Sequence, residues 1–421
     1  MRLLYSALFY ALLPALFARL LWRARTIPSY RQGLLQRLGF YQKPAIPGAL
    51  WLHAVSVGEI EAAIPIIRQL LKEKPGSPIL VTCTTPTGSQ RITAILGNSV
   101  QHVLLPYDVP SAVKRFLDHF RPVAGVIMET EIWPNLFYHC DRKGISLAIV
   151  NGRLSAKSAT GYQRMRGLTQ STLAKVSLVA AQTQEDADRY ISLGADPCRV
   201  QVTGNVKFDV TFGDEDKARS SALRAQLFPD RPVLVAGSTH PGEEEALLDV
   251  LLTLRHEQPE LLLVIAPRHP QRVPGLIALC RAKGYTHILR SEGKACNAAT
   301  DVFLVDTLGE LRTFYGAANI AFVGGSLIPH GGQNMLEPAV AGIPVLFGPH
   351  TANFKEIASG LCASGGGFRI NNTAELSTRI LNFLNQPELA RICGERGHKF
   401  VTANTGAVAR VITLINALSG R

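Results

Sequence analysis

Three side chains near the ends of predicted strands could perform acid-base chemistry: Glu59, Glu129 and Lys207. Glu59, the first acidic residue of the chain, follows the hydrophobic stretch ALWLHAVS and Gly58, where a strand gives way to a helix. The positive end of a helix dipole favours an ionised carboxylate at this position, ready to accept a proton. A structural acid of the first helical turn suits the same position, and the residues alone leave both interpretations open.

A second acidic group, METEIWPN, follows the strand-like run PVAGVIM. It places Glu129 at the strand end and Glu131 at the expected start of a helix. Two glutamates from separate strand ends of one sheet can share a site, one as base and the other orienting substrate or stabilising developing charge. Lys207, in GNVKFD, offers a mobile cation for a carboxylate or phosphate. A solvated linker lysine is the alternative for that position.

The second half of the chain carries three segments typical of anion binding. APRHP fixes Arg268 between two prolines, an arrangement suited to a phosphate or carboxylate. DTLGELR offers Gly309 and backbone N–H groups at a helix start. FVGGSLIPHGGQNMLEP combines a glycine-containing loop with a helix expected to begin near Asn334, and Glu337 could accept hydrogen bonds from ribose hydroxyls. The three glutamates of GEEEALL are interpreted as mostly structural.

Several common chemistries lack their motifs. Neither half carries GxGxxG after its first strand, and there is no Walker loop or Ser/His/Asp triad in the sequence. The histidines, such as His53 and His240, are expected to be hydrogen-bonding groups, and we assign neither a metal site nor a cofactor. Seven scattered cysteines without a CxxC pair indicate thiols in a reducing compartment, with neither disulfides nor zinc expected.

The elements that must position these residues alternate along the chain. Strand-like runs separated by helical patterns are ALWLHAVS, SPILVTCT, VQHVLLPY, PVAGVIME, SLAIVNG, LVAAQ and RVQVTG, then RPVLVAGST, ELLLVIAP, THILR, DVFLVD, NIAFVGG and IPVLFG. This alternation predicts two doubly wound parallel sheets in tandem. Ligands of such sheets bind beyond the carboxyl ends of the strands, so we expect the site in a cleft where the two sets of strand ends face each other.

Length and charge predict a two-domain protein with anionic partners. The 421 residues exceed one ordinary core, and 47% hydrophobic with 18% charged residues is typical of folded domains. A net charge of +12 favours nucleic acid, anionic lipid or phosphorylated partners. Charge alone does not choose among them.

The N-terminus has the character of a membrane segment. An apolar run, residues 3–18, is slightly short for a straight span, so a single span and an interfacial helix both remain open. Arg19, Arg23 and Arg25 follow the run and would resist translocation, which disfavours a cleaved secretory signal and keeps the rest of the chain in the cytoplasm. Each basic side chain near an anionic leaflet adds about 1 kcal/mol of attraction.

An ordered set of motifs resembles the bacterial 3-deoxy-D-manno-octulosonic acid (Kdo) transferases that act on lipid A. The motifs are HAVSVGEIEAAIP, TPTGSQR, QHVLLPYDVP, METEIWPN, AAQTQEDADR, TGNVKFD, STHPGEEE, APRHPQR, DTLGEL, FVGGSL, GGQNMLEPA and GPHTANF, and they cover nearly the whole chain. The resemblance implies a glycosyltransferase of the two-Rossmann (GT-B) architecture. It would move Kdo with inversion from CMP-Kdo to a lipid A precursor at the cytoplasmic face of the inner membrane, beside anionic lipid and without nucleic acid.

The resemblance also implies residue roles and domains. Glu59 corresponds to the general base, and Glu129 and Lys207 correspond to transition-state stabilisers. The expected CMP contacts are Pro267, Arg268, Leu308, Gly309, Glu310, Asn334, Met335, Leu336 and Glu337. Gln333 departs from the family pattern, because GGQN stands where GGHN is expected, and its role is open. The implied organisation is a membrane-associated segment at 1–25, an acceptor-binding domain at 26–207, a linker at 208–222, and a CMP-Kdo-binding domain at 223–421 whose last helices can pack back on the first domain.

Two other functions are compatible with the same residues. A UDP-sugar transferase of the same architecture would use similar strand ends. A membrane-attached lipopolysaccharide-binding protein without catalysis would explain the basic N-terminus alone. Protection by CMP or by UDP against thermal unfolding separates the two enzymes, and release of CMP during glycolipid formation separates an enzyme from a binding protein.

Overall fold

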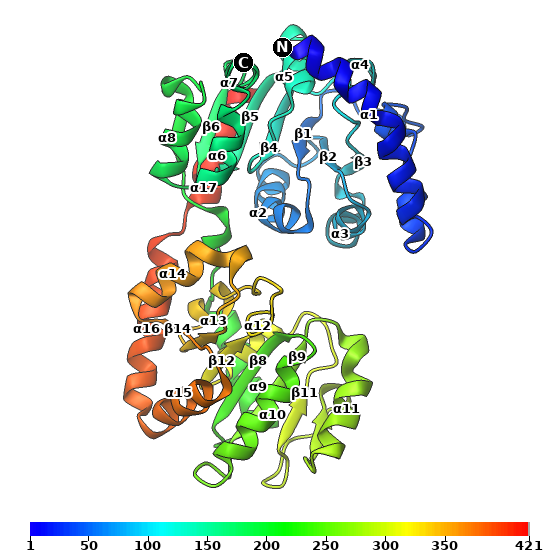
Figure 1. Cartoon of the computed structure of the whole chain (residues 1–421). Coiled ribbons are helices and arrows are strands. Elements are labelled where there is room, and N and C mark those ends of the chain that lie inside the picture. Colours follow the sequence, from blue (N-terminus) through cyan, green and yellow to red (C-terminus); the bar gives the residue numbers. More distant parts are fainter. Residues whose placement is uncertain (420–421) are drawn as a thin grey trace. The chain divides into compact units, whose positions relative to one another are not determined.

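The alternation of strands and helices produces two separate parallel sheets within residues 1–419, which the computed structural model describes (Figure 1). Each sheet is the centre of its own unit. Unit 1 contains residues 1–209 together with the chain from residue 405 onward, and unit 2 contains residues 210–404. Part of the segment expected to be a linker, residues 214–222, is therefore helical and belongs to unit 2.

The sheet of unit 1 has the order β3-β2-β1-β4-β5-β6-β7, and all its pairings are parallel. Its strands are β1 (Leu50–His53), β2 (Ile79–Cys83), β3 (Gln101–Leu104), β4 (Ala124–Met128), β5 (Ser146–Gly152), β6 (Leu178–Ala181) and β7 (Val200–Val202). The central strands are buried on both faces, which explains their almost unbroken hydrophobic sequence.

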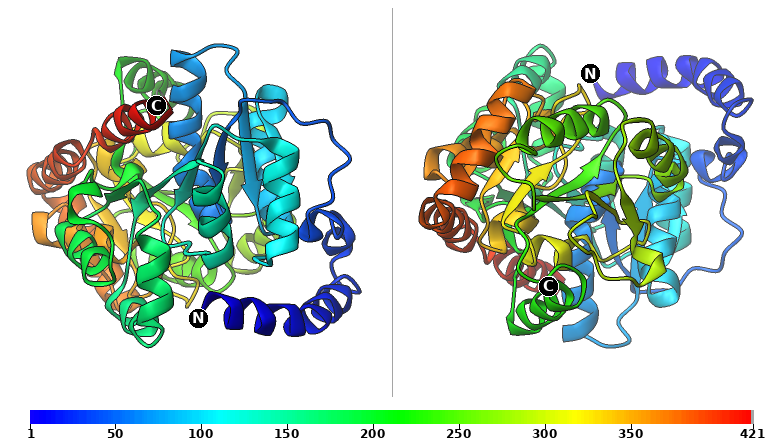
Figure 2. Two further views of the ribbon diagram at one scale, coloured as in Figure 1. Left: turned by 90° about the horizontal axis from the view of Figure 1, so that it is seen from above. Right: turned by 90° about the horizontal axis from the view of Figure 1, so that it is seen from below.

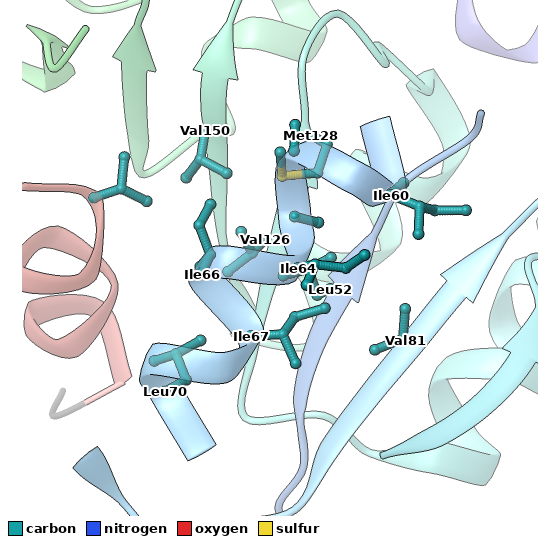
Figure 3. Packing of buried hydrophobic residues seen from close by; sticks show 14 of the residues in the cluster. Leu52, Ile60, Ile64, Ile66, Ile67, Leu70, Val81, Val126, Met128 and Val150 are labelled. Atoms are coloured by element: carbon teal, nitrogen blue, oxygen red, sulfur yellow. The ribbon is translucent and has the colours of Figure 1, made fainter. Parts of the chain in front are cut away.

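Helices cover both faces of this sheet. The helices of unit 1, of which the first lies at the periphery, are α1 (Arg2–Arg23), α2 (Val57–Glu73), α3 (Pro86–Leu96), α4 (Pro110–Phe120), α5 (Pro134–Arg142), α6 (Ala156–Gln163), α7 (Arg166–Leu173), α8 (Gln184–Ser192) and α17 (Ala407–Ser419). In α2, Ile60, Ile64 and Ile67 recur at helical spacing and pack on Leu52 and Val126 of the strands (Figure 3). Burying each such side chain contributes roughly 1.5–3 kcal/mol.

The sheet of unit 2 is also parallel, in the order β10-β11-β9-β8-β12-β13-β14. Its strands are β8 (Val233–Thr239), β9 (Leu262–Pro267), β10 (His287–Leu289), β11 (Val302–Leu304), β12 (Ile320–Val323), β13 (Val345–Phe347) and β14 (Gly367–Arg369). Its helices are α9 (Asp214–Leu227), α10 (Glu243–Leu254), α11 (Val273–Ala282), α12 (Leu311–Gly316), α13 (Leu336–Val340), α14 (Lys355–Ser364), α15 (Thr373–Asn385) and α16 (Pro387–Ala403). The prediction of two tandem Rossmann-like domains is confirmed.

Two elements differ from the sequence-based expectations. The strand β14 was not predicted, because it begins with the last of three consecutive glycines and its three residues carry little strand signal. The helix expected to start at Glu131 begins instead at Pro134, and proline at the first helical position explains that boundary.

The helix α17 completes unit 1 from the far end of the chain. Its residues Ala407, Val411, Ile412 and Ile415 are buried in the same core as α2. The carboxylate of Asp209 accepts hydrogen bonds from the backbone N–H groups of residues 406 and 408 and so caps the start of α17. The point where the chain leaves unit 1 is thus bonded to the point where it returns.

The apolar helix α1 is part of unit 1 and lies at its periphery (Figure 2). The hydroxyl of Ser6 is buried and donates to Asn135 Oδ1 at 2.9 Å, while Arg2 donates to the same oxygen at 3.0 Å. Further along the helix, the rings of Phe17 and Tyr107 meet edge-on at 5.9 Å. Contacts therefore run along most of α1, from Arg2 to Phe17.

Two stretches of the described chain are long and apolar enough to cross a membrane, Arg2–Arg23 and Pro387–Leu418. The second joins α16 and α17, which belong to different units and pack into protein cores. The first has few buried residues, 6% of its apolar window, and the others are half-buried or exposed. It is the better candidate for contact with lipid.

Candidate functional site

The start of α2 places Glu59 at the carboxyl end of β1. Ser56 is the N-cap of this helix and accepts a hydrogen bond from the Glu59 N–H at 3.3 Å. In return, the Glu59 side chain accepts from the Val55 N–H at 2.8 Å and from the Ser56 hydroxyl at 2.9 Å. This capping box explains how the carboxylate is held. The structural interpretation of Glu59 is therefore correct in part, and a carboxylate with two bonded oxygens still has free lone pairs.

Glu129 lies directly after β4 with a strained backbone. Its φ is +55°, in the left-handed region that non-glycine residues rarely adopt. The Glu129 N–H donates to Val150 O at 3.0 Å, and its carbonyl accepts from the Tyr190 hydroxyl at 3.0 Å. Strain of this kind persists where surrounding bonds fix it, and it is concentrated at functional sites.

Lys207 reaches Glu129 because a short turn holds it in place. The ammonium Nζ lies 3.9 Å from Glu129 Oε1, and the two side chains are 23% and 22% exposed. Buried Asn151, at the end of β5, accepts a hydrogen bond from the Val206 N–H at 3.1 Å, and Asn205 accepts from the Lys207 N–H at 3.0 Å. Both side chains of the pair are thus partly exposed to solvent, and hydrogen bonds to Asn151 and Asn205 hold the backbone at Lys207 in place.

Burial and neighbouring charge raise the pKa of two carboxyl groups at this site, those of Glu59 and Glu131. Burial raises the pKa of Glu59, and the nearby Glu129 charge raises it further against the hydrogen bonds from Val55 and Ser56. Burial, with the charges of Glu59 and Glu129, raises the pKa of Glu131 to about 7. Glu131 was noted in the sequence at the expected start of a helix, but it was not among the predicted catalytic residues. The charge of Glu59 thus acts on the pKa of Glu131, so the two carboxyl groups influence each other's protonation.

In unit 2 a buried carboxylate shapes the loop after β12. Glu243, which is fully buried, accepts hydrogen bonds from four backbone N–H groups at 2.7–3.0 Å, those of His240, Gly325, Ser326 and Leu327. The adjacent Glu244 is buried as well and pairs with Arg272 at 2.8 Å. Both agree with the structural interpretation of this glutamate run.

The expected nucleotide-binding residues all lie in unit 2, after three different strands. Pro267 is buried at the end of β9, and Arg268 is exposed with its N–H bonded to Thr239 O at 3.0 Å. Leu308 is 81% exposed and Gly309 is also exposed. Their neighbour Glu310 is already engaged by other residues of the protein, as follows.

Glu310 is held by a cation. Arg290 donates to its carboxylate through Nη2 at 2.9 Å and through Nε at 3.2 Å, and Thr307 donates as well. Burial alone would raise the pKa of Glu310, but the Arg290 and Thr307 bonds outweigh it and lower the pKa. A role at the ligand would therefore have to be shared with Arg290.

The segment Asn334–Glu337 precedes a helix shorter than expected. Met335 and Leu336 are buried, and α13 begins at Leu336 with only five residues. The Asn334 amide donates to Glu337 Oε1 at 3.0 Å, and Asn334 Oδ1 accepts from the Leu336 N–H at 3.1 Å. Asn334 is thus a turn residue that orients Glu337.

A group of histidines at the same edge was not predicted as a unit. The rings of His240 and His330 stack with centroids 4.4 Å apart, and His269 approaches His240 edge-on at 6.2 Å. Gln333 Nε2 lies 3.3 Å from His240 Nε2. Burial, with the neighbouring His330 and His269, lowers the pKa of His240 to about 4, so this ring is neutral at physiological pH. His240 and His330 stand in the sequence motifs STH and PHGGQ, but the motifs did not predict that the two rings stack.

The described residues 1–419 contain no group of three or more His, Cys, Asp or Glu side chains that could hold a metal ion. The seven cysteines are free thiols in the structure. The site residues thus form two sets, with Glu59, Glu129 and Lys207 together in unit 1 and the nine expected nucleotide contacts in unit 2.

Comparison with known proteins identifies the family. A family model described as 3-deoxy-D-manno-octulosonic-acid transferase (kdotransferase) matches residues 32–210. The chain is 40% identical over 391 residues to the 3-deoxy-D-manno-octulosonic acid transferase of Haemophilus influenzae, covering 92% of each. It is 35% identical over 385 residues to the transferase of the same name from Bordetella pertussis, covering 89% of each.

A solved structure shares the fold. The UDP-GlcNAc 2-epimerase of Neisseria meningitidis bound to UDP-GlcNAc has a TM-score of 0.56 at 14% identity, with 88% of this chain and 100% of that chain covered. Identity this low establishes the architecture alone. The long matches to the two transferases establish more: the chain belongs to the 3-deoxy-D-manno-octulosonic acid transferases, a family of glycosyltransferases.

Proposed function

We propose that this protein transfers Kdo from CMP-Kdo to a lipid A precursor, with inversion, at the cytoplasmic face of the inner membrane. The observation that carries the proposal is the cluster in unit 1, where Glu59, Glu129 and Lys207 meet beyond the carboxyl ends of the strands. Together with the family, this cluster supports proton abstraction beside a site of developing charge.

Glu59 is the proposed general base. Its raised pKa makes the ionised carboxylate a stronger base than an exposed glutamate, and the capping box fixes its direction. The carboxylate takes the proton of an acceptor sugar hydroxyl, and the oxygen attacks the anomeric carbon of Kdo. The bond from that carbon to CMP breaks, and CMP leaves with the bonding electrons from the opposite face. Configuration at the anomeric carbon is therefore inverted.

Glu129 and Lys207 are the proposed transition-state stabilisers. Positive charge at the anomeric carbon is stabilised by a carboxylate, and the negative charge of carboxylate or phosphate groups by an ammonium. The exposed guanidinium of Arg268, in unit 2, is proposed to bind the phosphate of CMP together with the other expected contacts after β9, after β11 and before α13. Transfer would then require donor and acceptor to be held at the same time.

The membrane location is proposed from α1. One side of this helix is bonded to unit 1, and the other exposes large apolar side chains. The exposed residues are Leu3, Leu4, Leu8, Leu12, Leu21 and Trp22. A helix of 22 residues is about 33 Å long and could cross a bilayer. A crossing helix would have to leave its buried bonds to Asn135, so we infer that α1 lies in the plane of the interface.

The exchange Glu59→Gln tests the proposed chemistry. Glutamine also serves in capping boxes, so the variant should keep its melting temperature and its affinity for CMP. Kdo transfer from CMP-Kdo to the lipid acceptor should fall by about 10²- to 10⁴-fold. Mass spectrometry of the glycolipid measures transfer and also counts the Kdo residues added.

Glu61→Gln is the matched control. Glu61 is exposed on the same helix and pairs with Arg91, so its loss should leave transfer unchanged. Near wild-type transfer by Glu59→Gln would refute the base assignment. Thermal protection by UDP in place of CMP would instead favour a UDP-sugar enzyme, and CMP-Kdo binding without CMP release would favour a binding protein.

A further inference from the structure

A hollow of about 600 Å³ lies beyond the carboxyl ends of β12, β13 and β14 in unit 2. Its volume is in the range of ligand pockets, about 300–1,000 Å³. The residues that line it include His330, Gly331, Asn353, Lys355 and Arg369. None of the expected nucleotide contacts is among them.

The charge of this hollow has one sign. Lys355 and Arg369 both line it, and no Asp or Glu is among its lining residues. Within residues 1–419, neither cation forms an ion pair with a carboxylate. Two cations without a carboxylate partner beyond the carboxyl ends of parallel strands favour an anionic ligand.

The contrast with a second hollow is informative. A hollow of about 630 Å³ at the amino ends of the strands in unit 2 is also lined by arginines. There, Arg224 donates to Arg231 O at 2.8 Å, and Arg231 donates to Glu260 O and Asn297 O. These guanidinium groups thus donate hydrogen bonds to carbonyl oxygens of the protein itself. Lys355 and Arg369 have no comparable bonds.

The loops around the cationic hollow are fixed. Asn353 donates its backbone N–H to Gly331 O at 2.9 Å and its amide to His330 O at 3.2 Å. A Cβ on Gly331 would lie 2.6 Å from the Asn353 amide, so only glycine allows the two loops to approach this closely. The buried Glu243 carboxylate holds the start of the same loop. A hollow built in this way is preorganised for its ligand.

The hollow adjoins the proposed donor site through His330. This residue lines the hollow and also stacks on His240, at the end of β8. The chain order of the sheet reverses between β8 and β12, which is where ligands of such sheets bind. The expected nucleotide contacts on Arg268 and Gly309 lie on the β9 and β11 side, and the hollow lies on the β13 and β14 side.

We propose that Lys355 and Arg369 bind the carboxylate of the sugar acid carried by the donor. The inference rests on the proposed function, because Kdo bears a carboxylate that the CMP part of the donor lacks. A nucleotide phosphate would offer the same charge to the two cations. The test must therefore separate the carboxylate from the phosphate.

The experiment measures dissociation constants of CMP, CMP-Kdo and the uncharged carboxamide of CMP-Kdo by calorimetry. In the variant Lys355→Gln/Arg369→Gln, the dissociation constant of CMP-Kdo should rise about 10- to 100-fold, the loss expected for charge-assisted hydrogen bonds. The CMP constant should stay within about twofold. The carboxamide should bind the wild type and the variant equally well.

The control variant Arg281→Gln/Lys283→Gln removes the same charge from the C-terminal end of α11, at the other half of the sheet. It should bind all three ligands as the wild type does. Equal weakening of CMP and CMP-Kdo in the first variant would assign the cations to the phosphate and overturn the inference. Unchanged binding of CMP-Kdo by the first variant would also overturn the inference, because it would show that the two cations are solvated surface charges. A wild type that binds neither ligand would contradict the proposed function itself.

Discussion

At the scale of single residues, the candidate base is also a structural residue. The spacing of Ser56 and Glu59, three residues apart, is the signal of a capping box and was present in the sequence. The rule that ligands bind beyond the carboxyl ends of parallel strands led to the prediction that Glu59, Glu129 and Lys207 share a site, and the structure shows these side chains near one another in unit 1. The rule could not give the positive φ of Glu129 or the support by Asn151, because both depend on contacts between residues far apart in the chain.

Glu131 should make stability depend on pH. Its pKa is raised from the ordinary value of 4.5 to about 7, so the folded protein keeps a proton that the unfolded chain releases in this window. The stability it contributes is complete below about pH 4.5 and is lost as the pH rises through 7. The neutral side chain of Glu131→Gln has no proton to lose. Between pH 5 and pH 8, the free energy of unfolding of this variant should therefore fall by roughly 1–3 kcal/mol less than that of the wild type.

Urea unfolding followed by tryptophan fluorescence measures this effect. The three tryptophans, Trp22, Trp51 and Trp133, all belong to unit 1, so the signal reports the unit that contains Glu131. The exposed Glu61→Gln should keep the pH profile of the wild type. An identical profile for Glu131→Gln would show that this carboxyl group is not buried as described.

At the scale of elements, most strands and amphipathic helices were predictable, including the three-residue strands β10, β11 and β13. The strand β14 was missed, and the helix expected near Asn334 begins at Leu336 and has only five residues, too few for a periodic pattern to give its length. The loop bonds around Glu243 were equally beyond prediction, because a run of three glutamates shows its acidity but not which carboxylate is buried. The apolar α1 was predicted as an element, and its docking was not.

The docking of α1 predicts a specific response to lipid. Leu8 is 60% exposed on the side away from unit 1, so Leu8→Asp should fold normally and bind anionic vesicles at least about tenfold more weakly. Trp22 is 68% exposed, and its fluorescence should shift to the blue when vesicles are added to the wild type. Leu252→Asp, an exposed leucine of unit 2, is the matched control.

The same vesicles distinguish the two membrane arrangements. A helix in the interface is released by alkaline carbonate, whereas a spanning helix requires detergent. Release only by detergent would show that α1 leaves Asn135 and crosses the bilayer.

At the scale of the whole molecule, the sequence patterns predicted two sheets, and only the family resemblance implied that the last helices can pack back on the first domain. The apolar side chains of α17 fit a core, yet nothing in their spacing says which sheet they cover. The structure places them in unit 1, on α2 and the strands β4 and β5. Tertiary packing therefore decided a boundary that local pattern could not.

Loss of one α17 contact should destabilise unit 1. Ile415 is 1% exposed in its core, and Ile415→Ala should cost about 2–4 kcal/mol in the tryptophan-detected unfolding of unit 1. The neighbouring Thr413→Ala, which is exposed, should change stability by less than about 0.5 kcal/mol. An equal and small effect of both variants would contradict the packing of α17 in unit 1.

The return of the chain to unit 1 sets an order of events during synthesis. Residues 210–404 are contiguous and can fold as they leave the ribosome, but the first sheet lacks part of its cover until residues 405–419 have emerged. The nascent chain would therefore present its apolar first helix early and close that core last. Contact with a bilayer can thus precede completion of the half of the protein that bears Glu59.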